Sequence, residues 1–137
     1  MDFRFEIEGG NFSKAGHASS EVKKILKKLN VNSKIIKRIV VALYEAEVKV
    51  VAHAYKGEIF VDIDTSQVKV KLVDSGPGIP DIDLAMTQGF STASDKVREM
   101  GFGAGMGLPN IKKNADSFHI ESVVNKGTTL EIVTKLS

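Results

Sequence analysis

The sequence predicts an α+β fold, a two-layer sandwich in which helices cover one face of a mixed, mostly antiparallel sheet. Three observations support this fold class. A strand-like segment and two helical segments follow one another at the N-terminus. Two further strand-like segments around residues 59–72 are joined by a short polar turn, as in a hairpin. A long polar stretch then precedes one short helix and two last strands, so the predicted order is βααββ, a loop and αββ.

The composition is that of an ordinary globular chain of 137 residues, and this length fits one domain over residues 1–137. The net charge of +2 is too small to indicate binding to nucleic acid or to an anionic membrane. Because cysteine is absent, disulfides, thiolate metal sites and cysteine nucleophiles are excluded. Neither a signal peptide nor an apolar run of roughly 20 residues is present, so a cytoplasmic location is expected.

The first three elements follow from alternation and helical periodicity. Apolar and charged residues alternate over residues 3–7, which predicts a strand. A helix is expected to end near Leu29, and a longer one to span about residues 33–55. Each begins beside residues that commonly cap helices, Ser13 or Ser19 for the first and Asn32 or Ser33 for the second.

A polar stripe on the longer helix carries Glu45, Lys49 and His53 at successive i, i+4 spacings, so their side chains lie above one another. One interpretation is an exposed ion pair with a histidine near the helix C-terminus. The other places a carboxylate and an ammonium over the phosphates of a ligand. The spacing alone leaves both open.

The second half is expected to contain a hairpin, a long loop, a helix and two strands. Asp74 is placed where the hairpin ends and a glycine-rich turn begins. A carboxylate in such a place often only starts a turn. The expected elements are strands near 59–63 and 68–72, a short helix near 82–86, a helix at about 108–115, and strands at about 118–124 and 128–136.

Two glycine-rich turns, residues 74–79 and 101–108, bracket the loop. Glycine allows the backbone to approach a ligand closely. The second turn leads into a helix start, where exposed N–H groups bind anions. These turns predict a phosphate-bearing ligand, with Asp74 recognising another part of it. The spacings match neither a P-loop nor the dinucleotide fingerprint.

Read in order, the motif blocks resemble the small bacterial anti-sigma-factor kinases, including switch kinases of stress-signalling complexes, within the histidine kinase-like (GHKL) ATPase family. The resemblance covers nearly the whole chain. The blocks that carry it are residues 42–46, 53–55, 74–80, 89–92, 101–108 and 126–129. It implies a Bergerat-type ATP-binding fold with an ATP lid at about 81–102.

The resemblance also implies a role for each site residue. Glu45 would be the general base, and Asp74 would accept a hydrogen bond from the adenine amino group. His53 would be structural or would support a residue that contacts the ligand. The remaining residues would contact ATP or ADP: Gly76, Gly78, Ile79, Leu108 and Thr128 around the base, and Gly103, Gly105, Met106 and Gly107 at the phosphates.

Lys49 departs from the family pattern, which places a Mg²⁺-binding asparagine four residues after the general base. A lysine has no acceptor and repels a cation, so this residue argues against Mg²⁺ binding, and no metal ligand is assigned. Lys49 could instead contact the phosphates directly. It could also pair with Glu45 and lower the pKa of that carboxyl, which would weaken it as a base.

Two functions follow from the resemblance and its departure. The first is an ATP-dependent serine/threonine kinase that binds and phosphorylates an anti-sigma antagonist-type partner. The second, favoured by Lys49, is a non-catalytic module in which nucleotide controls partner binding. A sigma factor as a second partner and a homodimer are further expectations; neither nucleic acid nor membrane is an expected partner.

Overall fold

The computed structural model describes residues 1–79, 82, 86 and 107–136. The strands are β1 (Asp2–Glu8), β2 (Lys56–Ile63), β3 (Gln67–Ser75), β4 (Ser117–Val123) and β5 (Gly127–Lys135). The helices are α1 (His17–Lys28), α2 (Ser33–His53) and α5 (Gly107–Lys113), with a short 3-10 turn at Phe12–Lys14. The predicted order of elements is confirmed.

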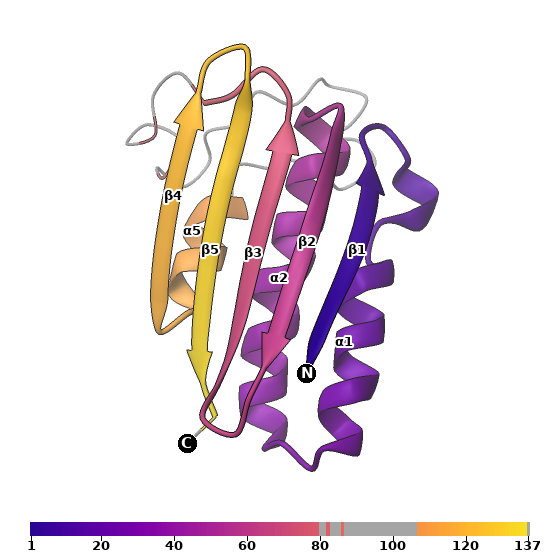
Figure 1. Cartoon of the computed structure of the whole chain (residues 1–137), viewed down its shortest axis with the longest axis vertical. Helices are drawn as coiled ribbons and strands as arrows, with labels where there is room; N and C mark the ends of the chain where they lie inside the picture. The colour runs from indigo at the N-terminus through magenta and orange to yellow at the C-terminus, as the bar shows by residue number, and fades with distance from the viewer. Residues whose placement is uncertain (80–81, 83–85, 87–106, 137) are drawn as a thin grey trace.

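The five strands form one sheet in the order β1-β2-β3-β5-β4. All four pairings between the described strands are antiparallel, so the sheet is antiparallel throughout rather than mixed. The three helices cover one face of it, and α2 lies between α1 and α5 (Figure 1). The predicted two-layer α+β fold is confirmed.

Strict alternation along the strands explains why one face of the sheet is buried. Every second residue of β2 and β3 points toward the helices, and these positions are apolar until the strand ends. Burying this apolar stripe between sheet and helices is the main favourable term for folding. The core contains Val22 and Leu26 of α1, Ile39, Leu43 and Val50 of α2, Ile59, Val61, Val70 and Leu72 of the hairpin, and Ile111, Leu130 and Ile132.

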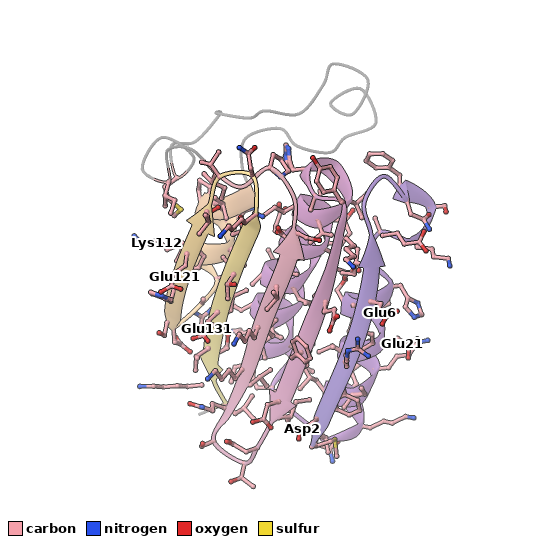
Figure 2. The ribbon with its side chains drawn as sticks, turned by 45° about the horizontal axis from the view of Figure 1, so that its top comes forward. Asp2, Glu6, Glu21, Lys112, Glu121 and Glu131 are labelled. Carbon is pink, nitrogen blue, oxygen red and sulfur yellow. The ribbon has the colours of Figure 1, made fainter. Side chains whose placement is uncertain are left out.

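The opposite face of the sheet is exposed and mostly polar, although Phe60, Val73 and Val123 also lie on it. Glu6, Glu121 and Glu131 lie on β1, β4 and β5 on this face (Figure 2). Across β1 and β2, Arg4 Nε donates to Glu58 Oε2 at 2.9 Å. Exposed pairs of this kind contribute roughly 0–1 kcal/mol to stability, so the packed face fixes the fold.

The helix starts differ partly from the prediction. Asn32 caps α2 as one alternative expected, because its side-chain oxygen accepts from the backbone N–H of Lys34 at 2.9 Å. The N-cap of α1 is Gly16 rather than Ser13 or Ser19. The N–H groups at this end are satisfied instead by a buried carboxylate of α2, that of Glu47.

Most of the predicted lid, about residues 81–102, lies outside the described residues, as do Gly103, Gly105 and Met106. Within the predicted short helix, the backbone N–H of Met86 donates to the carbonyl of Ile82 at 2.9 Å, which is helical spacing. None of the helices in the described parts of the chain is long and apolar enough to cross a membrane.

Candidate functional site

The candidate site lies at the end of the sheet where β3 and α2 finish and the turn between β4 and β5 begins (Figure 1). Asp74 is the last but one residue of β3, at the strand end where the sequence placed it, and it is buried. The backbone N–H of Thr128 on β5 donates to Asp74 Oδ1 at 3.0 Å. The carboxylate therefore binds a neighbouring strand, so local turn formation does not explain its position.

Lys49 makes the second contact to Asp74. Its Nζ donates to Asp74 Oδ2 at 2.9 Å, and the two side chains are only 12% and 3% exposed. Of the two interpretations that the spacing left open, the exposed ion pair of Glu45 and Lys49 is therefore wrong. The long lysine side chain reaches from α2 to β3, and the charge of the buried carboxylate holds it there.

His53 lies one helical turn after Lys49, at the end of α2. Burial lowers the pKa of its imidazole, and the positive charge of Lys49 lowers it further, while Asp74 opposes both effects. Both effects favour the neutral form of the ring. A neutral imidazole adds no second cation beside the Lys49–Asp74 pair.

Glu45 lies one helical turn before Lys49 and is partly buried. Burial raises the pKa of its carboxyl, and a hydrogen bond with the Asn110 side chain partly opposes that rise. A Cβ added at Gly107 would lie 3.5 Å from Glu45 Oε2. Glu45 thus faces the start of α5, whereas Lys49 faces β3.

The first glycine turn packs tightly against backbone. A Cβ added at Gly76 would lie only 3.0 Å from Cα of Ala54, the residue that follows α2. Gly78 has φ +76°, and a Cβ there would collide with the carbonyl of Val123. These contacts require glycine whether or not a ligand binds. The predicted approach of this backbone to adenine stays a prediction.

A chain of hydroxyl groups fastens the same turn to the β4–β5 hairpin. The N–H of Ile79 donates to Ser122 Oγ at 2.8 Å, and this oxygen lies 2.9 Å from Thr128 Oγ1. Thr128 therefore links the turn to Asp74 through its own backbone and side chain. The turn and the carboxylate form one hydrogen-bonded unit.

The structure brings several of the predicted residues together. Lys49 and Thr128 each donate a hydrogen bond to Asp74, and Glu45 lies beside Gly107. Ile79 packs at the edge of the core and Leu108 is buried in it.

Sequence reasoning missed three polar residues: Asn110, Ser122 and Glu47. The sequence pattern could have pointed to two of them. Ser122 continues the inward-facing positions of β4 after two apolar residues, and Glu47 falls within the buried stripe of α2.

The donor set favours an amino group over a metal ion at Asp74. Each carboxylate oxygen has two lone pairs, so Asp74 can accept a further hydrogen bond beside those from Thr128 and Lys49. The described residues contain no group of three or more His, Cys, Asp or Glu that could hold a metal. Lys49 itself supplies only donors. The residues therefore fit an amino-bearing base and do not fit Mg²⁺ at Lys49.

Comparison with known proteins shows the family to which the chain is related. Residues 13–134 match the model of the histidine kinase-like ATPase domain family. The serine/threonine-protein kinase RsbT of Bacillus subtilis is 35% identical over 100 residues, covering 70% of this chain and 69% of that protein.

Two anti-sigma F factors are also similar. That of Thermoanaerobacter sp. is 29% identical over 66% of this chain and 64% of its own length. That of Geobacillus stearothermophilus is 34% identical over 63% of this chain and 60% of its own length. The alignments thus span less than two thirds of these two factors.

A solved structure of the RsbU and RsbW domains of Rv1364c from Mycobacterium tuberculosis has the same fold. It superposes with a TM-score of 0.67 at 14% identity, covering 99% of this chain and 32% of that one. The family match spans most of the chain and includes Glu45, Asp74 and Thr128. The chain therefore belongs to the histidine kinase-like ATPase domain family.

Proposed function

We propose that this chain is an ATP-binding regulatory kinase that transfers phosphate to a serine or threonine of an anti-sigma antagonist-type protein. The observation that carries the proposal is the partly buried Glu45 carboxylate, whose pKa is raised by burial. Glu45 lies on the same helix as Lys49, which is hydrogen-bonded to Asp74. Proton transfer that depends on a nucleotide needs an acceptor that binds the nucleobase and a nearby carboxylate whose pKa is raised. Asp74 and Glu45 offer these two groups on adjoining elements.

Asp74 would hold the base of the nucleotide by accepting from its amino group. Adenine carries an amino group at this edge where guanine carries a carbonyl, so the site would select ATP or ADP. Gly76, Gly78, Ile79, Leu108 and Thr128 would surround the base, and Gly103, Gly105, Met106 and Gly107 would face the phosphates. ATP supplies the phosphoryl group when it is bound.

Glu45 would take the proton from the attacking hydroxyl. A general base works best when its pKa lies near the operating pH, and burial moves that of Glu45 upward in this direction. The Asn110 side chain would orient the carboxylate. The pairing of Lys49 with Asp74 leaves Glu45 free of the ion pair that would have lowered its pKa.

The partners follow from the relatives' names. The similarity to anti-sigma F factors supports an anti-sigma antagonist-type protein as the substrate, and a sigma factor as a further partner. Such proteins meet in the cytoplasm, and a homodimer is compatible with this role. Proteins encoded beside this chain are the first candidates to test.

A second function, a non-catalytic module whose partner binding is controlled by nucleotide, is favoured by one observation. Lys49 holds a buried position without offering a ligand to Mg²⁺. Phosphoryl transfer normally needs a metal to neutralise the transferred group. Without that neutralisation, nucleotide binding would only shift the chain between conformations.

Single-turnover phosphate transfer from γ-labelled ATP to the candidate partner separates the two functions. We expect wild-type transfer, and a loss of about 10²- to 10⁴-fold in Glu45→Gln with ATP affinity kept. The matched control is Glu21→Gln, which removes an exposed carboxylate from α1. Wild-type and Glu45→Gln proteins that both bind ATP and both fail to transfer phosphate would establish the non-catalytic module.

A further inference from the structure

We propose that Lys49 is an intramolecular competitor for the base: its ammonium holds the acceptor on Asp74 that an adenine amino group needs. This inference rests on the proposed role of Asp74 in binding adenine. It assigns Lys49 to the base end of the site, rather than to the phosphates or to a metal. The bound base then has to displace Lys49, share Oδ2 with it, or share Oδ1 with the backbone of Thr128.

The competition follows from how the two oxygens of Asp74 are used. Oδ1 accepts from the backbone of Thr128, which is held in the sheet by its pairing with Ser122 of β4. Oδ2 accepts from Lys49 at 2.9 Å. A ligand cannot remove the backbone donor without disrupting the hairpin, so the lysine is the donor that can yield.

Charge makes sharing unfavourable as well. The hydrogens of an amino group carry positive partial charge, so a donor placed beside the ammonium on Oδ2 is repelled by it. With side chains 12% and 3% exposed, water screens this repulsion only weakly. Burial and the charge of Lys49 both lower the pKa of His53, so within the described part of the chain the ammonium that bonds Asp74 is the cation that opposes the base.

The local structure keeps the competitor in place. Lys49 extends from the last turns of α2, and Asp74 stands on β3, which is paired on both sides. A lysine side chain has about four rotatable bonds, so its ammonium can leave Asp74 without any shift of helix or strand. The Lys49–Asp74 contact therefore acts as a reversible lock: it blocks the subsite for the nucleobase and can open while the helix and the strand stay in place.

Adenosine is the probe that tests this lock, because it presents the base without phosphates that would attract a lysine for other reasons. Binding is followed by chemical-shift titration, which measures weak affinities. We expect Lys49→Met to bind adenosine at least tenfold more tightly than wild type. Lys49→Arg keeps the cation and should bind as weakly as wild type.

Lys69→Met is the matched control, since it removes an exposed lysine from the uncovered face of β3. It should leave adenosine affinity unchanged. An adenosine affinity that is the same in wild type, Lys49→Met and Lys49→Arg would overturn the inference. If neither adenosine nor ATP binds to wild type or to Lys49→Met while both are folded, the proposed nucleotide function itself fails.

A measurement on the wild-type protein covers the case in which Lys49→Met fails to fold. Lysine side chains are labelled at Cε, and the Lys49 signal is identified by its absence in Lys49→Arg. Saturating adenosine should shift this signal because the ammonium leaves Asp74. A signal that stays in place at saturation would show that Lys49 does not compete.

Discussion

At the scale of single residues, the site depends on how charges are buried in pairs. Asp74 is buried because Thr128 and Lys49 satisfy its two oxygens. Removing one partner of such a pair leaves an uncompensated charge, which costs about 3–5 kcal/mol. Glu45 is only partly buried and has a hydrogen bond with Asn110 in place of a cation. Two carboxylates on adjoining elements therefore have different environments and different proposed roles.

His53 should make stability fall as the pH falls. Its pKa is lowered in the folded chain from the ordinary 6.5, so the unfolded chain takes up the proton first. Stability from the neutral ring is present above about pH 6.5 and is lost as pH falls through the folded pKa. We expect His53→Gln to lose less stability than wild type between pH 7 and 5, measured by urea unfolding. Parallel pH profiles for the two proteins would contradict this assignment.

At the scale of elements, the start of α1 depends on a residue of α2. Glu47 is fully buried, and its carboxylate accepts from the N–H groups of Gly16, Ala18 and Ser19 at 3.1, 3.2 and 2.7 Å. A negative charge at a helix N-terminus is also favoured by the helix dipole. This contact fixes the position of α1 against α2.

Glu47→Gln should destabilise the chain by about 2–3 kcal/mol, because a neutral amide offers one acceptor where the carboxylate offers two charged ones. Chemical denaturation measures the change. Glu21→Gln on α1 is the control, since its pair with Lys24 is exposed and 3.4 Å long. It should cost less than about 1 kcal/mol. Equal losses in the two variants would show that Glu47 does not cap α1.

The β4–β5 turn places Gly127 directly against β3. Its φ is +150°, and a Cβ there would overlap the carbonyl of Asp74. Gly127→Ala should cost about 3 kcal/mol from backbone strain and overlap together. Gly10→Ala is the matched control, because φ is +79° there but no atom lies within 4 Å of the added Cβ. It should cost only about 1 kcal/mol of strain in thermal or chemical unfolding. A Gly127→Ala protein as stable as Gly10→Ala would contradict the close packing.

At the scale of the whole molecule, local patterns predicted the elements but not their pairing. Alternation in residues 3–7 and helical periodicity in residues 33–55 are local, and both elements exist within two residues of the expected bounds. The order of strands depends on contacts such as Val73 with Thr129, which no local pattern contains. The antiparallel insertion of β5 between β3 and β4 therefore had to come from the structure.

The candidate site shows the same division. The glycine motifs identified Asp74 because their spacing is local. The i, i+4 stripe brought Glu45 and Lys49 together in the sequence, yet the helix turns them toward α5 and β3 respectively. The partner of Lys49 is 25 residues away, and burial rather than helix geometry selects it. The role of Glu47 could not be predicted, because its partners are backbone N–H groups of another helix and no sequence pattern shows them.

The central claim, that Asp74 makes this fold an adenine nucleotide site, is tested most directly by calorimetry. ATP and GTP are titrated into wild-type and Asp74→Asn proteins, after circular dichroism shows that both are folded. The account predicts that wild type binds ATP but not GTP, and that Asp74→Asn loses about 1.5–3 kcal/mol of ATP binding free energy with the charged acceptor. Equal ATP affinity in the two proteins, or equal binding of ATP and GTP to wild type, would contradict it.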